Sequence, residues 1–572
     1  MSQTSTSKSQ RQPWYAWVLL FLLLALTAWG TRYWMSPTFG LYEDDLTFIP
    51  GAIEADFGDV LSMVAGYFST LAEQGRPFMW SWVVLFGHLG WHLGGLQGMY
   101  IIGYSIWLIN IILFVLLLKR IQGSFLFCVF GGLAYVLFPA DTNQAFLFNA
   151  FGLQTAIIFF IVALHIYLSK GKLRWLAYFF LILVMLNYET PFWLFLAAPL
   201  LTRANGRDLK KRLLANTLLV TFIFLTIYLF RLAAGESRAA SLGFPEMILI
   251  PIKHMAIGPF VGLGAYFLRP FQVLRNIDFG MASALLLASG IFFGFLYWVA
   301  RGSEGSEKEL LPVTKGWWAD LTDETRRELR IFLAGLVMLI LAYPLTVILR
   351  PYAISGRETR VHLASVVGAS LIFASTGMVI FRALMKKGFR AAFLILLSLI
   401  FGFNFAFGFL IQRDYKKAWT LQKNFWQNVI PLIEDVREGT IVLVEPSGLE
   451  DTLYINANTW NVPRILPQMF VFPNTWEEIP RVFRMIAGWE NTLVRIPGFY
   501  TLDGTNVFAF NRNFGDFRQT NTIFISTSSG EFRRRLDPLP LDGEAEVKPV
   551  GEEILDTFPT RPLYHLLIED NE

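Results

Sequence analysis

The chain begins with the apolar run WYAWVLLFLLLALTAWGTRYW (Trp14–Trp34), which decides the class of fold. Its length of about 20 residues is what an α-helix needs to cross a bilayer, whereas the apolar core of a cleaved signal peptide has about 7–15 residues. No small-residue cleavage site follows the run. We therefore predict that Trp14–Trp34 is a retained transmembrane helix, preceded by a polar segment that carries Lys8 and Arg11.

The composition indicates a membrane protein rather than a soluble one. Of the 572 residues, 54% are hydrophobic and 16% are charged, whereas about 25% of residues are charged in soluble domains. These values exclude an ordinary cytosolic enzyme, a disordered protein and a secreted disulfide scaffold. The single cysteine, Cys128, can form no disulfide within the chain. The net charge of the chain is only +4, and its basic residues lie in short loops between apolar runs. This distribution is typical of loops that set the orientation of membrane helices and not of a nucleic-acid binding surface.

Apolar runs recur along the first three quarters of the chain and predict an α-helical polytopic protein with about eleven transmembrane helices. The runs after Trp14–Trp34 are near 98–118, 123–139, 151–169, 175–188, 190–202, 213–234, 278–300, 331–349, 361–384 and 391–411. The region 175–202 is ambiguous, because it is either one helix kinked at Pro191 or a short hairpin of two helices.

Basic loops decide between these two alternatives. Lys and Arg cluster at 119–120, 170–174, 203–212, 301–330 and 386–390. The positive-inside rule places such loops in the cytoplasm. A single crossing by 175–202 would put two of the clusters on opposite faces, so we predict the hairpin. Its arms are shorter than the bilayer core of about 30 Å, so its tip, which carries Glu189, should lie below the outer surface.

An odd number of spans from a cytoplasmic N-terminus places the C-terminus outside. We therefore expect an integral protein of the plasma (inner) membrane with a transmembrane domain, 1–411, and an extracytoplasmic α+β domain, 412–572. Strands at Gly439–Pro446 and Thr522–Thr527 and an amphipathic helix at Trp419–Val436 are expected in the second domain. Two long outer loops, about 36–97 and 236–277, should contain helices that lie at the interface or re-enter the membrane.

Three carboxylates stand together at the start of the first outer loop, in Leu41-Tyr42-Glu43-Asp44-Asp45-Leu46. A solvated loop or a helix N-cap would account for them, since Asp favours that position. Alternatively, Asp44 or Asp45 is a general base and the other acids position an acceptor. The same loop contains Gly75-Arg76-Pro77, in which Arg76 is either a phosphate ligand or a side chain that snorkels to water.

This pattern resembles the GT-C superfamily of membrane glycosyltransferases. The acids Tyr42-Glu43-Asp44-Asp45 with Gly75-Arg76-Pro77 are most similar to the Gtr-type glucosyltransferases, and the protein O-mannosyltransferases and lipid A aminoarabinose transferases share the plan. The resemblance covers residues 1–411 and does not extend to the C-terminal domain. It implies a sugar donor on a polyprenyl phosphate, transfer at the outer face, and an Asp of the first outer loop as catalytic base.

The residues themselves fit such a reaction. A glycosyl phosphate already carries its leaving group, so the protein must supply a base for the acceptor hydroxyl and cations for the departing phosphate. One base and a single displacement would invert the anomeric centre. Further candidates are the carboxylate of Glu189 as a second catalytic acid and, as cations for the donor phosphate, Arg357, Arg360, Lys253 and His254, with Arg269 next in line.

Metal binding is the weaker expectation. His88 and His92 have the i, i+4 spacing of a metal pair, but glycines surround them and no third ligand stands nearby. We predict no metal site there. Carboxylates suit Mg²⁺ or Mn²⁺, so a divalent cation at Asp44 and Asp45 is retained as an option.

The sequence thus predicts a glycosyltransferase that uses a polyprenyl-phosphate sugar and transfers it to a glycan, lipid or protein acceptor beside the membrane lipids. Two alternatives are retained: a transporter or flippase of lipid-linked glycans, and a non-catalytic envelope assembly protein. No internal repeat is present, which disfavours the transporter.

Overall fold

The structure is a computed structural model of the chain. It describes residues 12–70, 75–169, 171–204, 206–234, 244–302, 323–346, 350–385, 388–444, 449, 451–458, 461–484, 506–509, 512–516, 522–527, 531–535 and 554–569. Lys8, Arg11, most of the loop 301–330, residues 347–349 of the predicted span 331–349 and residues 445–446 of the predicted strand lie outside the described residues.

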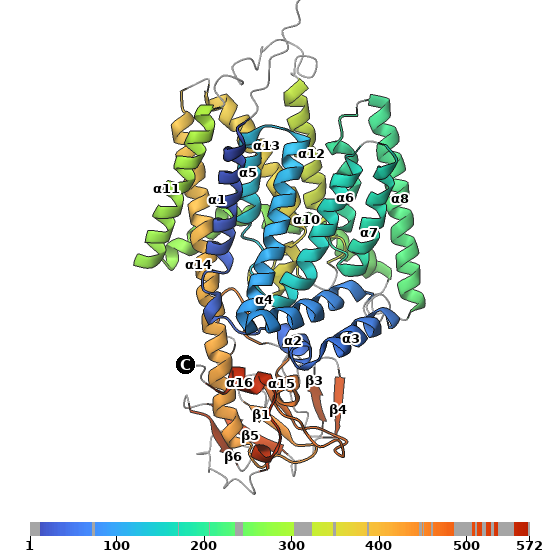
Figure 1. Cartoon of the computed structure of the whole chain (residues 1–572), viewed down its shortest axis with the longest axis vertical. Coiled ribbons are helices and arrows are strands. Elements are labelled where there is room, and N and C mark those ends of the chain that lie inside the picture. The colour runs from blue at the N-terminus through green and yellow to red at the C-terminus, as the bar shows by residue number, and fades with distance from the viewer. Residues whose placement is uncertain are drawn as a thin grey trace, which may run out of the picture.

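Long helices form a bundle at one end of the molecule, with a smaller α+β part at the other (Figure 1). The bundle elements are α1 (Trp14–Arg32), α4 (Pro77–Ile121), α5 (Phe125–Val136), α6 (Gln154–Tyr167), α7 (Leu176–Asn187), η5 (Phe192–Leu201), α8 (Gly206–Ala233), α10 (Phe244–Arg275), α11 (Phe279–Gly302), α12 (Asp323–Leu341), α13 (Ser365–Met385) and α14 (Arg390–Val429). Short turns of helix lie at Ser36–Thr38, Asn149–Leu153 and Lys172–Trp175. The predicted polytopic α-helical class is confirmed.

Eight helices in the described part of the chain are long and apolar enough to cross a membrane. All of them except α10 overlap a predicted span. The structure also has helices at the other expected positions, such as α5, α7 and η5, but these are short or more polar, so the number eleven stays a prediction.

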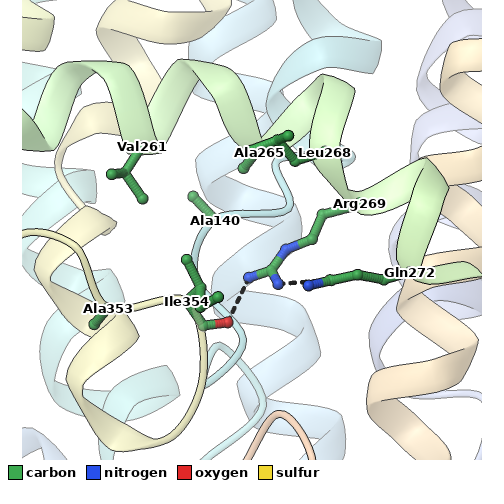
Figure 2. A pocket seen from close by; sticks show the side chains of 8 residues that line it. All are labelled: Ala140, Val261, Ala265, Leu268, Arg269, Gln272, Ala353 and Ile354. Carbon is green, nitrogen blue, oxygen red and sulfur yellow. Dashed lines mark hydrogen bonds between the residues drawn. The ribbon is translucent and has the colours of Figure 1, made fainter.

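The segment predicted to be a proline-broken outer loop is one continuous helix, α10, with Pro251, Pro259 and Pro270 inside it. These prolines do not end the helix, and α10 lies within the segment 236–277, where interfacial or re-entrant helices are expected. In Figure 2 the α10 ribbon runs across the ribbons behind it instead of along them. Its neighbours in the chain, the end of α8 and the start of α11, lie at the same end of the bundle (Figure 1).

The segment predicted as the first outer loop, about 36–97, contains three helical stretches. These are α2 (Asp45–Glu54), α3 (Phe57–Ser69) and the first half of α4, which form a layer between the bundle and the C-terminal part (Figure 1). Helix α4 turns at Gly94 and Gly95, whose backbone is not helical, and Gly95 has φ +58°. Because glycine adopts a positive φ without steric cost, this pair lets residues 77–93 lie across the bundle end while residues 96–121 enter the bundle.

Hydrogen bonds place the basic loops at one common end of the bundle. The joined pairs are Arg120 with the His165 carbonyl, Gln122 with Glu328, Arg382 with Glu328, and Arg330 with the Ala204 carbonyl. The loops at 170–174 and 203–212 therefore lie on the same side, as a hairpin requires. Helix α7 and the 3₁₀ helix η5 are its two short arms, with Glu189 in the turn between them.

Helix α14 passes without a break from the bundle into the C-terminal part (Figure 1). The boundary predicted between residues 411 and 412 lies inside this helix. Helix does form over most of the segment Trp419–Val436 predicted to be an amphipathic helix. Residues 419–429 are the end of α14, and a short 3₁₀ turn, η7 (Ile430–Leu432), follows.

A mixed sheet of four strands, in the order β2-β1-β5-β6, forms the centre of the C-terminal part. Strand β1 pairs in parallel with β2 and β5, and β6 pairs antiparallel with β5. The elements are β1 (Ile441–Val444), β2 (Arg481–Arg484), β5 (Thr522–Ser526), β6 (Arg533–Arg535), the hairpin β3 (Asn506–Ala509) and β4 (Arg512–Asp516), and the helices α15 (Val462–Met469) and α16 (Pro562–Leu567). Strands therefore form inside both of the segments predicted for them.

Candidate active site

The acidic turn that follows α1 is held against α14. Tyr42 donates from its hydroxyl to the Tyr415 carbonyl (2.9 Å), and Gln422 donates to the Leu41 carbonyl (2.9 Å). A Cβ on Gly40 would lie 1.8 Å from the Trp419 ring, so only glycine allows this approach. The turn thus lies where the bundle, the layer of α2 and the C-terminal part meet.

Asp45 is a buried anchor in this structure. Its side chain has no exposed surface, and its carboxylate accepts backbone N–H groups from Tyr42 (3.2 Å), Leu147 (3.2 Å) and Phe148 (2.6 Å). Burial raises the pKa of Asp45 to about 8, against the opposing effect of these hydrogen bonds. A group enclosed in this way joins the acidic turn to the 147–148 backbone.

Asp44 has different surroundings from its neighbour. It occupies the N-cap position of α2, but its side chain makes no capping hydrogen bond. Instead its carboxylate meets Arg360, with Nη1 to Oδ2 at 2.9 Å, and Arg357, with Nη2 to Oδ1 at 3.8 Å. The Asp44 side chain is 13% exposed and that of Arg357 is 24% exposed, so this group of one carboxylate and two guanidinium groups reaches the surface.

The short helix η6 (Arg357–His362) carries both arginines, and the loop before it is fixed by hydrogen bonds. Gly356 has φ +69°, and its carbonyl accepts from Asn143 Nδ2 (2.8 Å). The Thr359 hydroxyl bonds with Thr142 (2.9 Å). These contacts fasten η6 to the loop after α5, so the arginines are held where they meet Asp44.

Asp141 lies in the same loop and was not a predicted site residue. It is buried, and burial raises its pKa to about 6, while Asn143, Arg32 and Arg360 act in the opposite direction. Arg360 therefore interacts electrostatically with both Asp44 and Asp141. The only sequence signal for Asp141 was an acid in a short polar loop between two apolar runs.

Arg269, on α10, supports this loop and η6 from behind. Its guanidinium donates to the carbonyls of Pro139 (3.2 Å) and Ile354 (2.7 Å) and to Gln272 (2.7 Å). Figure 2 shows it at the edge of a small pocket whose other lining residues, apart from Gln272, are apolar. With three acceptors already bound, Arg269 fits a structural role better than the reserve phosphate contact expected from the sequence.

Arg76 and Glu189 form a second charged cluster. Arg76 donates from Nε to Glu189 Oε2 (2.9 Å) and from Nη2 to Oε1, and it lies over the Tyr188 ring at 4.7 Å. Arg231, on α8, lies 3.8 Å from the same carboxylate and donates to the Gly75 carbonyl (2.6 Å). Burial alone would raise the pKa of Glu189, but the two arginines outweigh it and lower the pKa to about 2.

Aromatic rings connect the two clusters. Phe48 lies one turn after Asp44, and Trp80 lies one turn after Arg76. The ring centroids of Phe48 and Trp80 are 4.1 Å apart. Phe148, whose N–H binds Asp45, lies 5.4 Å from Trp80 and 5.6 Å from Phe48. The predicted site residues of the first outer loop and Glu189 therefore belong to one region of the molecule.

The remaining predicted site residues lie elsewhere or are enclosed. Lys253 is exposed on α10, and the neighbouring His254 is buried, with Nδ1 2.9 Å from the Thr346 hydroxyl. The side chain of Glu43 is also buried. Among the described residues, no contact of Lys253 or His254 joins them to Asp44, so the structure does not bring them into the acidic site.

The described residues contain no group of three or more His, Cys, Asp or Glu side chains that could hold a metal ion. His88 and His92 do stack, with ring centroids 4.2 Å apart, and their Nδ1 atoms bond to the Ala52 and His88 carbonyls. At the acidic turn, Asp44 contacts two arginines and Asp45 accepts backbone amides.

The chain matches no protein family model, and no curated protein matches it in sequence. Among solved structures it aligns with crystal structures of ArnT from Cupriavidus metallidurans, one in the apo state and one bound to undecaprenyl phosphate. The identity is 15% in both, over 75% of this chain and 82% or 83% of those chains, with TM-scores of 0.30 and 0.28. Superpositions at these TM-scores transfer no residue roles.

Proposed function

We propose that the protein is a membrane glycosyltransferase that moves a sugar from a polyprenyl-phosphate donor to an acceptor at the outer face of the plasma (inner) membrane. The observation that carries this proposal is the group formed by Asp44, Arg357 and Arg360, where a carboxylate and two cations reach the surface together. The resemblance of the acidic loop to GT-C glycosyltransferases supports the same reaction class.

The proposed reaction uses both kinds of charge. Asp44 accepts the proton of an acceptor hydroxyl as its oxygen attacks the anomeric carbon, and the bond from that carbon to the phosphate oxygen breaks. The sugar ends on the acceptor with inverted configuration, and polyprenyl phosphate leaves with the bonding electron pair. Arg357 and Arg360 bind the phosphate, where guanidinium groups can donate two parallel hydrogen bonds. Within the described residues, the buried Nε of Arg360 has no hydrogen-bond partner.

Donor binding should also free the base. In this structure Asp44 is itself the anion that the two arginines bind. The donor phosphodiester, which carries one negative charge, competes for the same guanidinium groups and so reduces the neutralisation of the Asp44 carboxylate. Loss of a nearby positive charge raises the pKa of a carboxylate and makes it a better proton acceptor. The proposal therefore includes an order of binding, with the donor before the acceptor.

The other predicted site residues receive supporting roles in this proposal. Glu189 is paired to two arginines with a pKa of about 2, which makes it a poor base and a good structural partner. Arg76 is held by Glu189 and Tyr188, so the phosphate contact passes to η6. Asp45 holds the acidic turn, and Lys253 and His254 take no part in the proposed chemistry.

The test is transfer by the purified protein in detergent. Undecaprenyl-phosphate hexoses are supplied with an envelope extract that contains glycans, lipids and proteins, and the release of undecaprenyl phosphate is measured together with sugar in the products. Release that depends on Asp44 supports the proposal. Movement of the intact donor across proteoliposomes without release would instead identify a transporter. A parallel sample with a chelator, then with Mg²⁺ or Mn²⁺ restored, shows whether a divalent cation is needed.

A further inference from the structure

The C-terminal part contacts the acidic turn directly through one short stretch of chain. We call residues 453–458 and 461 the bridging segment. Asp414, on α14, fixes its beginning by accepting N–H groups from Leu453 (3.0 Å), Tyr454 (2.6 Å) and Ile455 (3.0 Å). The bridging segment is therefore bound to the helix that leads out of the bundle, and its position does not depend on the sheet alone.

Tyr454 connects the bridging segment to the arginine loop. Its carbonyl accepts the N–H of Gly356 (2.9 Å), the residue directly before Arg357, and the hydroxyl of Thr142 (2.8 Å). The backbone at the start of η6 is thus tied to the bridging segment as well as to the loop after α5.

Asn461 connects the other end of the bridging segment to the acidic turn. Its Nδ2 donates to the Glu43 carbonyl, and its Oδ1 accepts from the Thr47 hydroxyl (2.5 Å). Asn461 has no exposed surface, and its own N–H bonds to Asn458 Oδ1 (2.9 Å). One buried amide therefore holds the residue before Asp44 and the residue three positions after it.

The backbone of Glu43 shows why such a contact is needed. Its φ is +47°, and it is the one residue other than glycine with a positive φ in the described part of the chain. Residues with a Cβ rarely adopt this conformation, and it persists when surrounding contacts impose it. The contacts here are the Asn461 amide on the Glu43 carbonyl and the Ala457 carbonyl, which accepts the Glu43 N–H (3.5 Å).

We infer that the bridging segment is part of the active site and that Asn461 is a positioning residue for Asp44. The segment holds the backbone on both sides of the reaction centre, at Gly356 beside Arg357 and at Glu43 beside Asp44, and so fixes how the carboxylate faces the two arginines. This inference rests on the proposed function for its catalytic meaning. It assigns to the C-terminal part a task that the bundle cannot perform alone.

The first test needs no substrate. Hydrogen–deuterium exchange of the purified full chain in detergent is compared between wild type, Asn461→Ala and Thr47→Val. The control is Asp451→Asn, which breaks the exposed ion pair of Asp451 with Lys417 (2.8 Å) close to the bridging segment. Exchange in residues 41–48 should rise by about tenfold or more in Asn461→Ala, because local opening sets the exchange rate. Unchanged exchange in both variants would overturn the inference.

The second test separates positioning from binding. Asn461→Ala should lower kcat by about 10²-fold, the cost of a displacement of about 1 Å, while KM for the undecaprenyl-phosphate hexose stays within about twofold of wild type. Thr47→Val should lower kcat by a smaller factor, again with little change in KM. Thr47→Ser keeps the hydroxyl and should have a kcat close to that of the wild type. A rise in donor KM with unchanged kcat would overturn the positioning role.

The two tests also distinguish this inference from the proposed function. If exchange rises in Asn461→Ala while the wild-type protein transfers no sugar, the contact between the bridging segment and the acidic turn is supported and the proposed function is wrong. Because Thr47→Val removes only one hydroxyl contact, it keeps the test valid if Asn461→Ala does not fold.

Discussion

At the scale of single residues, two adjacent aspartates have opposite surroundings. Asp45 is enclosed by backbone amides, whereas Asp44 meets two arginines at a partly exposed edge. Adjacent side chains at the start of a helix point in different directions, so one anchors the turn while the other faces outward. The sequence predicted an acidic site here, but it could not say which aspartate would be buried.

Replacing Asp44 by Asn separates its two proposed roles. Turnover should fall by about 10²–10⁴, the usual contribution of a general base. Binding of undecaprenyl phosphate should become tighter, because the carboxylate no longer competes with phosphate for Arg357 and Arg360. Turnover is followed by release of undecaprenyl phosphate, and affinity by titration in detergent. Normal turnover in Asp44→Asn would remove Asp44 from the mechanism.

Replacing the arginines of η6 should weaken phosphate binding, whereas replacing Asp44 should strengthen it. Arg357→Ala or Arg360→Ala should weaken binding of undecaprenyl phosphate by about tenfold or more, since a charge-assisted hydrogen bond contributes about 1.5–3 kcal/mol. Lys should substitute poorly, because it lacks the planar pair of donors. Arg350→Ala is the matched control, as this side chain is 68% exposed and pairs with Glu358 in the same loop. Equal affinities for all three Ala variants would place the phosphate elsewhere.

At the scale of elements, the Arg76–Glu189 cluster holds the α7–η5 hairpin to the first outer loop and to α8. Glu189→Gln should lower thermal stability at pH 7, since loss of one partner of a buried ion pair costs about 3–5 kcal/mol. The Glu189 pKa is lowered to about 2 from 4.5, so its contribution is complete above pH 4.5 and is lost as the pH falls towards 2. Melting curves of both proteins should therefore converge in acid. A constant difference between them would contradict this account.

The elements also show what sequence patterns can and cannot predict. Apolar runs correctly predicted α1, α6, α8, α11 and α13, because burial in lipid requires such runs. The apolar run 391–411 predicts a helix that ends near residue 411, but α14 continues to Val429. Polarity changes the surroundings of a helix without ending it.

Sequence patterns could not predict which residues of the site contact each other, for a different reason. Arg76 and Glu189 are separated by 113 positions and Asp44 and Arg360 by 316. Nothing in local spacing connects residues so far apart. The candidate residues could be named from their chemistry, but their partners, and the role of Asn461, depend on how the elements pack.

At the scale of the whole molecule, the predicted topology can be checked by cysteine labelling. The natural Cys128 is buried and should not react with the labelling reagent. We expect Asp451→Cys to react with an impermeant reagent from outside and Arg207→Cys only after permeabilisation. Arg207 is preferred to the neighbouring Gly206, whose φ of +53° disfavours a side chain. Labelling of position 207 from outside would contradict the hairpin and the parity that depends on it.

Because α14 is unbroken, the number of residues in it determines the angle between the bundle and the sheet. Each residue of an α-helix adds about 1.5 Å and about 100° of rotation. An alanine inserted after Trp419 would therefore turn everything beyond it by about 100°. Gln422 would move away from the Leu41 carbonyl and the 453–455 amides would move away from Asp414, while Tyr415 would keep its contact with Tyr42. Two full turns, or about seven inserted residues, would restore the angle but add about 10 Å of height. The helix thus fixes both the rotation of the sheet and its height above the membrane. An insertion in α14 is compatible with the contacts of the sheet only if it preserves both the rotation and the height.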